Sequence, residues 1–251
     1  YKLIEQHSLD KQHGGYFEAF SRDWKIIGDG RLSEKDVNEK KTMNTHLHVL
    51  ESYTNLYRIW PGENLKKSIE LLIKNFLDHI INTSNNHLDL FFDEQWISKN
   101  SIISYGHDIE AAWLIQEAAE VIADEVLIAK TKVAAIKLAV AAEEGLSDDG
   151  GLWYEKENGH LVKQKHWWPQ AEAMVGFFNA WQVSKEERFL QRSLECWAFV
   201  KNKIIDKVNG EWLWGIDEND KAMFGEDKVG LWKCPYHNGR ACMEIIKRIH
   251  S

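Results

Sequence analysis

A loop followed by a helix recurs in this chain about every 60 residues, and this repeat limits the folds available to it. Each repeat combines a glycine- and aromatic-rich loop with apolar residues at helical spacing. Equivalent helix starts hold the polar residues His48, His107, Gln170 and His237. Repeats of this length made of helix pairs form an open solenoid or a closed α/α toroid. The pattern predicts an all-α protein in which the polar residues at matched turns converge on one cavity.

Apolar periodicity predicts about seven helices and no separate domains. They are expected at 44–60, 64–81, 105–122, 125–145, 168–183, 185–205 and from 236 to near residue 250. Asn44 or Thr45 is the expected N-cap of the first of these helices, and Pro235 fits the entry of the last. The glycine-punctuated loops between helix pairs read as hairpin-like. Residues 1–251 contain no linker or low-complexity tract, which predicts one domain.

Composition excludes several classes of partner. A formal net charge of −8 argues against nucleic acid and anionic membrane surfaces. No apolar run approaches the ~20 residues of a membrane span. The chain has three cysteines without a CxxC pair, which fits a reducing compartment and favours a cytoplasmic protein.

Tryptophan is unusually frequent, with 12 residues. Eight of them fall in loops or at helix starts: Trp24, Trp96, Trp153, Trp167, Trp168, Trp212, Trp214 and Trp232. The apolar face of a sugar stacks on an aromatic ring, so this distribution indicates a carbohydrate site, although about half of these rings are expected to be core residues under long loops.

The polar helix starts carry companions three residues away, on the same helix face. Glu51 follows His48, and Glu110 follows His107, so each glutamate is positioned to orient its histidine. The last helix pairs His237 with Arg240 in the same way.

Three chemistries fit these residues to different degrees. Metal catalysis is disfavoured, because His46 and His48 diverge by about 200° on a helix and no HExxH or Cys-His spacing occurs. Glycoside hydrolysis needs two carboxylates, for which Asp108, Glu110 and Glu172 are candidates. Proton transfer at carbon needs two bases near neutral pH, a task that suits histidines better.

Four ordered motifs resemble the cellobiose/mannobiose 2-epimerase branch of the N-acylglucosamine 2-epimerase family over essentially the whole chain. They are Met43-Asn-Thr-His-Leu-His-Val-Leu-Glu-Ser-Tyr, Gly106-His-Asp-Ile-Glu-Ala-Ala-Trp, Trp167-Trp-Pro-Gln-Ala-Glu and Trp232-Lys-Cys-Pro-Tyr-His-Asn-Gly-Arg. The resemblance implies an (α/α)6 barrel without a cofactor or metal, which epimerises C2 of a reducing-end sugar through an enediol(ate).

The resemblance also implies roles for individual residues. His107 and His237 would be the acid/base pair, and His48 would assist ring opening or stabilise the intermediate. The resemblance places Asn44, Asp36, Glu110, Trp168 and Trp232 around the sugar, and the matched helix starts add Glu172 and Arg240 as candidate sugar ligands.

Length is where this chain departs from that family, whose members have twelve helices. The missing helices would precede Tyr1, so we expect an incomplete arc with an exposed apolar flank that favours self-association. The family's early arginine near the reacting carbonyl has no counterpart here. Two alternatives therefore stay open beside an epimerase: an α/α-toroid glycoside hydrolase and a non-catalytic carbohydrate-binding fragment.

Overall fold

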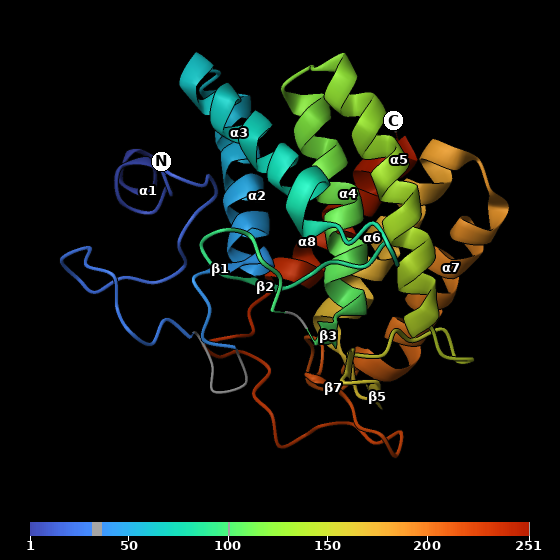
Figure 1. Ribbon diagram of the computed structural model, residues 1–251. Helices are drawn as coiled ribbons and strands as arrows, with labels where there is room; N and C mark the ends of the chain where they lie inside the picture. The colour runs from blue at the N-terminus through green and yellow to red at the C-terminus, as the bar shows by residue number, and fades with distance from the viewer. Residues whose placement is uncertain (32–36, 100, 251) are drawn as a thin grey trace. The chain divides into compact units, whose positions relative to one another are not determined.

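Helices make up most of the chain in the computed structural model, which describes residues 1–31, 37–99 and 101–250 (Figure 1). The α-helices of this described part are α1 (Lys2–His7), α2 (Met43–Ile59), α3 (Glu63–Asn75), α4 (Tyr105–Val121), α5 (Glu125–Ala142), α6 (Trp167–Ser184), α7 (Glu187–Phe199) and α8 (Tyr236–His250). The helices predicted from periodicity are therefore confirmed. The observed helices differ from the predicted ones in their last turns. A π-helical turn follows α3 at Phe76–Ile80 and α7 at Val200–Ile204, and a 3₁₀ turn follows α5 at Glu143–Gly145.

Contacts divide the chain into two compact units. Unit 1 comprises Tyr1–Ile102 and Leu114–Val133, and unit 2 comprises Ile103–Trp113 and Ala134–Ser251. The boundary crosses α4 and α5, so each of these helices contributes one part to each unit. The single domain over residues 1–251 and the incomplete arc stay predictions.

The loops are closed by short antiparallel pairings, as the hairpin-like pattern predicts. An isolated bridge recurs in each loop: Leu9 with Tyr16, Ile81 with Leu88, Leu146 with Leu152, and Ile205 with Trp212. Strands of two or three residues add further pairings: β1 (Lys41–Thr42) with β2 (Phe91–Phe92), β6 (Lys165–His166) with β7 (Gly215–Ile216), and a sheet ordered β3 (Ile102–Ile103), β4 (Glu155–Glu157), β5 (His160–Val162). The structure thus confirms the repeat.

In unit 1, α2 packs against α3 and begins one residue before its predicted start. The N-cap is Thr42, whose hydroxyl accepts a hydrogen bond from the Thr45 amide at 3.1 Å. Extended backbone at Thr42 (φ −125°, ψ 147°) comes from its pairing with Phe91 in the β1–β2 ladder. The prediction of Asn44 or Thr45 as N-cap is wrong, because the strand ends immediately before Met43.

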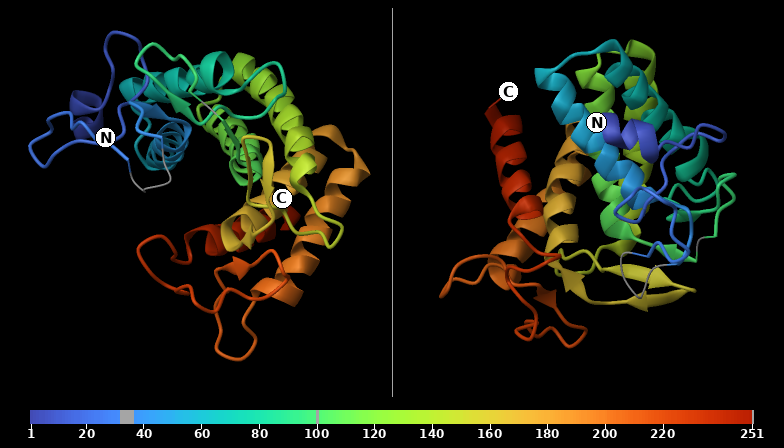
Figure 2. Two further views of the ribbon diagram at one scale, coloured as in Figure 1. Left: turned by 60° about the horizontal axis from the view of Figure 1, so that its bottom comes forward. Right: turned by 90° about the vertical axis from the view of Figure 1, so that its left-hand side faces the viewer.

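In unit 2, α6 packs against α7 and α8 (Figures 1 and 2). Its residues are apolar on nearly every side and almost all buried, as expected for a helix surrounded by other helices. Gly176 permits close packing, since a Cβ there would lie 2.5 Å from the Ile109 carbonyl oxygen of α4. The β4–β5 hairpin lies at the N-terminal end of α6, as Figure 2 shows.

The last helix, α8, leaves an apolar stripe exposed. Met243, Ile246 and Ile249 lie three residues apart and are 65%, 60% and 62% exposed. This agrees with the predicted exposed flank, while self-association through it stays a prediction. Among the described residues, no helix has the length and apolar character needed to cross a membrane.

His46 lies in the core of unit 1 and is held as a neutral imidazole. Its Nδ1 donates to the Thr42 carbonyl at 2.7 Å, and its Nε2 accepts from the Tyr16 amide at 2.9 Å. An Nε2 that accepts from an amide carries no proton, so the ring is uncharged. Burial, reinforced by the charge of Lys41, lowers the pKa of His46 from 6.5 to about 4, against the opposing hydrogen bond to Thr42.

Acid should therefore destabilise this protein through His46. The unfolded chain binds a proton near pH 6.5, and the folded chain binds it only near pH 4, so stability falls as pH decreases through that interval. The difference corresponds to roughly 3 kcal/mol. Urea unfolding at pH 7 and pH 4 should show a larger loss for the natural protein than for His46→Gln, whose amide does not titrate. Equal losses would contradict this account of His46.

Candidate active site

Two histidines approach one tryptophan ring in unit 2. Trp168, on the first turn of α6, has its ring centroid 4.6 Å from that of His107 and 5.7 Å from that of His237. His107 lies on the first turn of α4, and His237 on the first turn of α8. All three side chains are partly exposed, so a ligand can reach them. The structure brings these two helix starts to one ring, and the cavity predicted for them stays a prediction.

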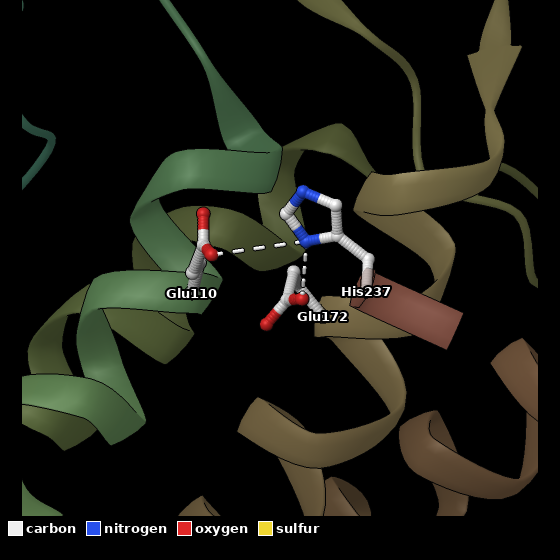
Figure 3. Close-up of side chains that lie close together, drawn as sticks. All are labelled: Glu110, Glu172 and His237. Atoms are coloured by element: carbon white, nitrogen blue, oxygen red, sulfur yellow. Dashed lines mark hydrogen bonds and ion pairs between the residues drawn. The ribbon is translucent and has the colours of Figure 1, made fainter. Parts of the chain in front are cut away.

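The imidazole of His237 is oriented by a buried carboxylate (Figure 3). Its Nδ1 lies 2.8 Å from Glu172 Oε1 and 3.8 Å from Glu110 Oε1. An ionised carboxylate only accepts hydrogen bonds, so Nδ1 carries the proton. In the neutral ring, Nε2 is then left as the proton acceptor.

Arg240 joins the same two carboxylates one turn further along α8. Its Nη2 donates to Glu110 Oε1 and to Glu172 Oε1, each at 2.7 Å. The other oxygen of Glu172, Oε2, accepts from the Trp113 indole at 3.1 Å. Both oxygens of this carboxylate therefore have donors, which come from α4 and α8.

The surroundings of Glu172 favour its ionised form. Glu110 and Glu172 have no measurable exposure. Burial raises the pKa of the Glu172 carboxyl, but the Arg240 charge and the hydrogen bonds from His237 and Arg240 outweigh it, so its pKa lies below its usual value. Glu172 thus remains an anion that can hold His237 in one tautomer.

His107 has a different partner at the equivalent nitrogen. Its Nδ1 lies 2.8 Å from the hydroxyl of Ser104, three residues earlier. A hydroxyl both donates and accepts, so this contact orients the ring in either tautomer. Glu110 was expected to orient His107, as Glu51 orients His48. At Nδ1 of His107 the structure differs, because Ser104 occupies this nitrogen and Glu110 pairs with Arg240 of α8.

Gly106 explains how Trp168 comes so close to α4. A Cβ at this position would lie 2.6 Å from two atoms of the Trp168 ring and 3.0 Å from the Pro169 Cβ. Any side chain would therefore push the indole away from His107.

Comparison with known proteins identifies relatives that carry this architecture. The family model of N-acylglucosamine 2-epimerase (GlcNAc 2-epimerase) matches residues 1–241. The chain belongs to this family. It is 49% identical over 245 residues to cellobiose 2-epimerase of Bacteroides fragilis, covering 97% of this chain and 62% of the relative. Cellobiose 2-epimerase of Dictyoglomus turgidum is 43% identical over 250 residues, covering 99% and 64%.

A solved family member has the same fold. The structure of cellobiose 2-epimerase from Bacillus thermoamylovorans aligns with a TM-score of 0.93 at 42% identity, covering 99% of this chain and 64% of that one. The fold class is accordingly that of the α/α toroids. The chain spans somewhat less than two thirds of the length of these relatives.

The other predicted site residues are distributed over both units. His48 and Asn44 lie on α2 in unit 1, where His48 Nδ1 is 3.5 Å from Glu51 Oε2, confirming the predicted pairing. That His48 joins His107 and His237 stays a prediction. Asp36 falls outside the described residues. Trp232 lies on the loop before α8 with 59% of its surface exposed.

In the third repeat, Gln170 takes the helix-start position that a histidine takes in the other repeats, and its function is structural. Gln170 is fully buried, and its side chain bonds to the Leu152 amide at 2.7 Å and to the Leu152 carbonyl at 2.8 Å. Its amide also donates to the carbonyl of His166. Gln170 therefore fixes a loop to α6 and does not face a ligand.

The Glu110–Glu172–His237 cluster also has the composition of a metal site, since its donor atoms lie within 4.8 Å of one another. Arg240 Nη2 already contacts both carboxylates at 2.7 Å, which is the position a cation needs. The donors consequently fit a guanidinium ion and require no metal.

Three contributors to the site were not predicted from the sequence: Ser104, Trp113 and Tyr236. Trp113 follows Glu110 by three residues, and Ser104 precedes His107 by three, so the helical spacing used for the glutamates could have indicated both. Tyr236 accepts a hydrogen bond from Arg240 Nη1 at 2.6 Å, and its position four residues before Arg240 on α8 could have indicated that contact as well.

Substitution of Gly106 tests this geometry. Gly106→Ala should lower the free energy of unfolding by about 1–3 kcal/mol, the scale of overpacking, and should change the near-ultraviolet circular dichroism of the tryptophans. Gly239→Ala on α8 is the matched control, because a Cβ there meets nothing within 4 Å. The control should be neutral or slightly stabilising. If both variants unfold alike, Gly106 is not needed for close packing.

Proposed function

We propose that this chain forms part of a sugar 2-epimerase that inverts C2 at the reducing end of a β-1,4-linked disaccharide of the cellobiose type. The main observation in support of this proposal is the placement of His107 and His237 against one Trp168 ring. Inversion requires removal of a proton from one face of the carbon and delivery to the other, and two imidazoles provide the two bases. Relatives named cellobiose 2-epimerase, one of them 49% identical, supply the substrate class.

In this mechanism, one histidine removes the C2 proton from the open-chain sugar, and the electrons move onto the carbonyl oxygen to give an enediolate. The other histidine then protonates the opposite face, so atoms and charge balance without a redox step. His237 uses Nε2, because its Nδ1 proton is held by Glu172. Trp168 stacks on the sugar. The roles that the family resemblance implies for His48, Asn44 and Trp232 are part of the proposal.

The carboxylate geometry does not favour the hydrolase alternative. Glycoside hydrolysis needs one protonated and one ionised carboxyl group on opposite sides of the bond. Glu110 and Glu172 instead share one guanidinium group, and Asp108 is fully buried. A reducing, cytoplasmic setting is part of the proposal and is supported by three free thiols, Cys196, Cys234 and Cys242.

Isotope exchange distinguishes the candidate functions. The intact protein, incubated with cellobiose in D2O, should form the C2 epimer with deuterium at C2, because each imidazole exchanges its proton with solvent between turnovers. Nuclear magnetic resonance of the reducing-end sugar measures both epimer and deuterium. Glucose release would support hydrolysis, and binding without turnover would support the carbohydrate-binding alternative. Epimer without deuterium would argue against the two-histidine mechanism.

Single-histidine variants test the assignment of one base to each face. His107→Asn and His237→Asn should each lower epimerisation by roughly 100- to 10,000-fold. Each variant should still exchange the C2 proton of one epimer with D2O. The epimer that exchanges should differ between the two variants. His160→Asn, at an exposed position on β5, is the control and should keep full activity. Retention of the same epimer by both variants would overturn the assignment.

A further inference from the structure

Arg240 lies inside the site but makes its polar contacts with protein groups. Its Nη2 bridges Glu110 and Glu172, and its Nη1 donates to the Tyr236 hydroxyl at 2.6 Å. The guanidinium carbon also lies 5.0 Å from the Trp113 ring centroid and 4.4 Å from that of Tyr236. Two aromatic faces and two carboxylates therefore fix this group, whose side chain is only 12% exposed.

The charges of the cluster depend on this arginine. Two carboxylates without measurable exposure face each other within 4.8 Å, together with His237 Nδ1. Without a cation between them, like charges at this distance favour protonation of one carboxyl group. A protonated Glu172 could donate to His237 Nδ1, which would move the ring proton to Nε2 and remove the base.

We propose that Arg240 is a built-in cation that occupies the equivalent of a divalent-metal site and thereby keeps His237 in the tautomer that leaves Nε2 basic. It is a positioning residue, acting through Glu110 and Glu172, and the sequence-based assignment as a sugar ligand is replaced by this role. The effect on turnover rests on the proposed epimerase function. The cation-site geometry does not, so the two parts are tested separately.

Removal of the guanidinium should open the cluster to a metal ion. Arg240→Met keeps an unbranched stem, removes the guanidinium group and leaves the three donor atoms of Glu110, Glu172 and His237 facing one space. Titration with Co²⁺ should then produce visible d–d absorption that EDTA abolishes, whereas the natural protein should show none. Arg240→Lys should also exclude Co²⁺, because the ammonium ion keeps the cation in place. Absence of Co²⁺ binding in a folded Arg240→Met protein would overturn the proposal.

Arg248→Met is the matched control for metal binding. Arg248 lies two turns further along α8, 5.8 Å above the same Trp113 ring, and donates to Asn179 and Gln182. These acceptors lie outside the cluster, so loss of Arg248 should create no cobalt absorption and leave turnover unchanged. Co²⁺ binding by this control equal to that of Arg240→Met would refute the specific role of Arg240.

Kinetics test the link to His237. Arg240→Met should lower kcat on the order of 100-fold with KM changed less than about threefold, since the arginine does not hold the sugar. Arg240→Lys should lose on the order of tenfold in kcat and decides the question if the Met variant does not fold. A raised KM with unchanged kcat in either variant would return Arg240 to the sugar ligands. Suppose that Arg240→Met binds Co²⁺ but the natural protein shows no epimerase activity. That result would support the cation site and reject the proposed function.

Discussion

The contact between Glu172 and Arg240 is the interaction on which the site in unit 2 depends. A carboxylate in a fully buried position is stable only when its oxygens have donors, and here the donors come from α4 and α8. The same contact therefore fixes α4, α6 and α8 around one charge. His237 Nδ1 and Arg240 both bond to Oε1 of Glu172. The pairing of Glu172 with Arg240 therefore also sets the position of the His237 imidazole.

The backbone provides the second constraint. His107, Trp168 and His237 all lie on first helical turns, where side chains face the loop end of a helix. Gly106 removes the side chain that would separate Trp168 from His107. One missing Cβ and one buried charge pair thus both contribute to the approach of two imidazoles to the same indole ring.

Much of this arrangement could be predicted from sequence, because it depends on local periodicity. Helical spacing identified the helices, and matched helix starts identified His107 and His237. The N-cap at Thr42 was not predictable in this way, since it depends on pairing between Thr42 and Phe91, 49 positions later in the numbering. Similarly, Glu110 was assigned to its neighbour His107, but in the fold a partner from α8, Arg240, reaches it.

The backbone bridges that close the loops allow a loop to change while the helix ends stay in place. Each loop closes on its own backbone within a few residues of the preceding helix, as at Ile205 and Trp212, while the ionisable groups of the site stand on helices. Insertions beyond such a closure leave the helix ends in place. Under the proposed function, changes in loop length and composition therefore alter the surroundings of the sugar without moving the histidines on the helices. On that proposal, the choice of sugar and the proton transfer depend on different parts of the chain and can evolve separately.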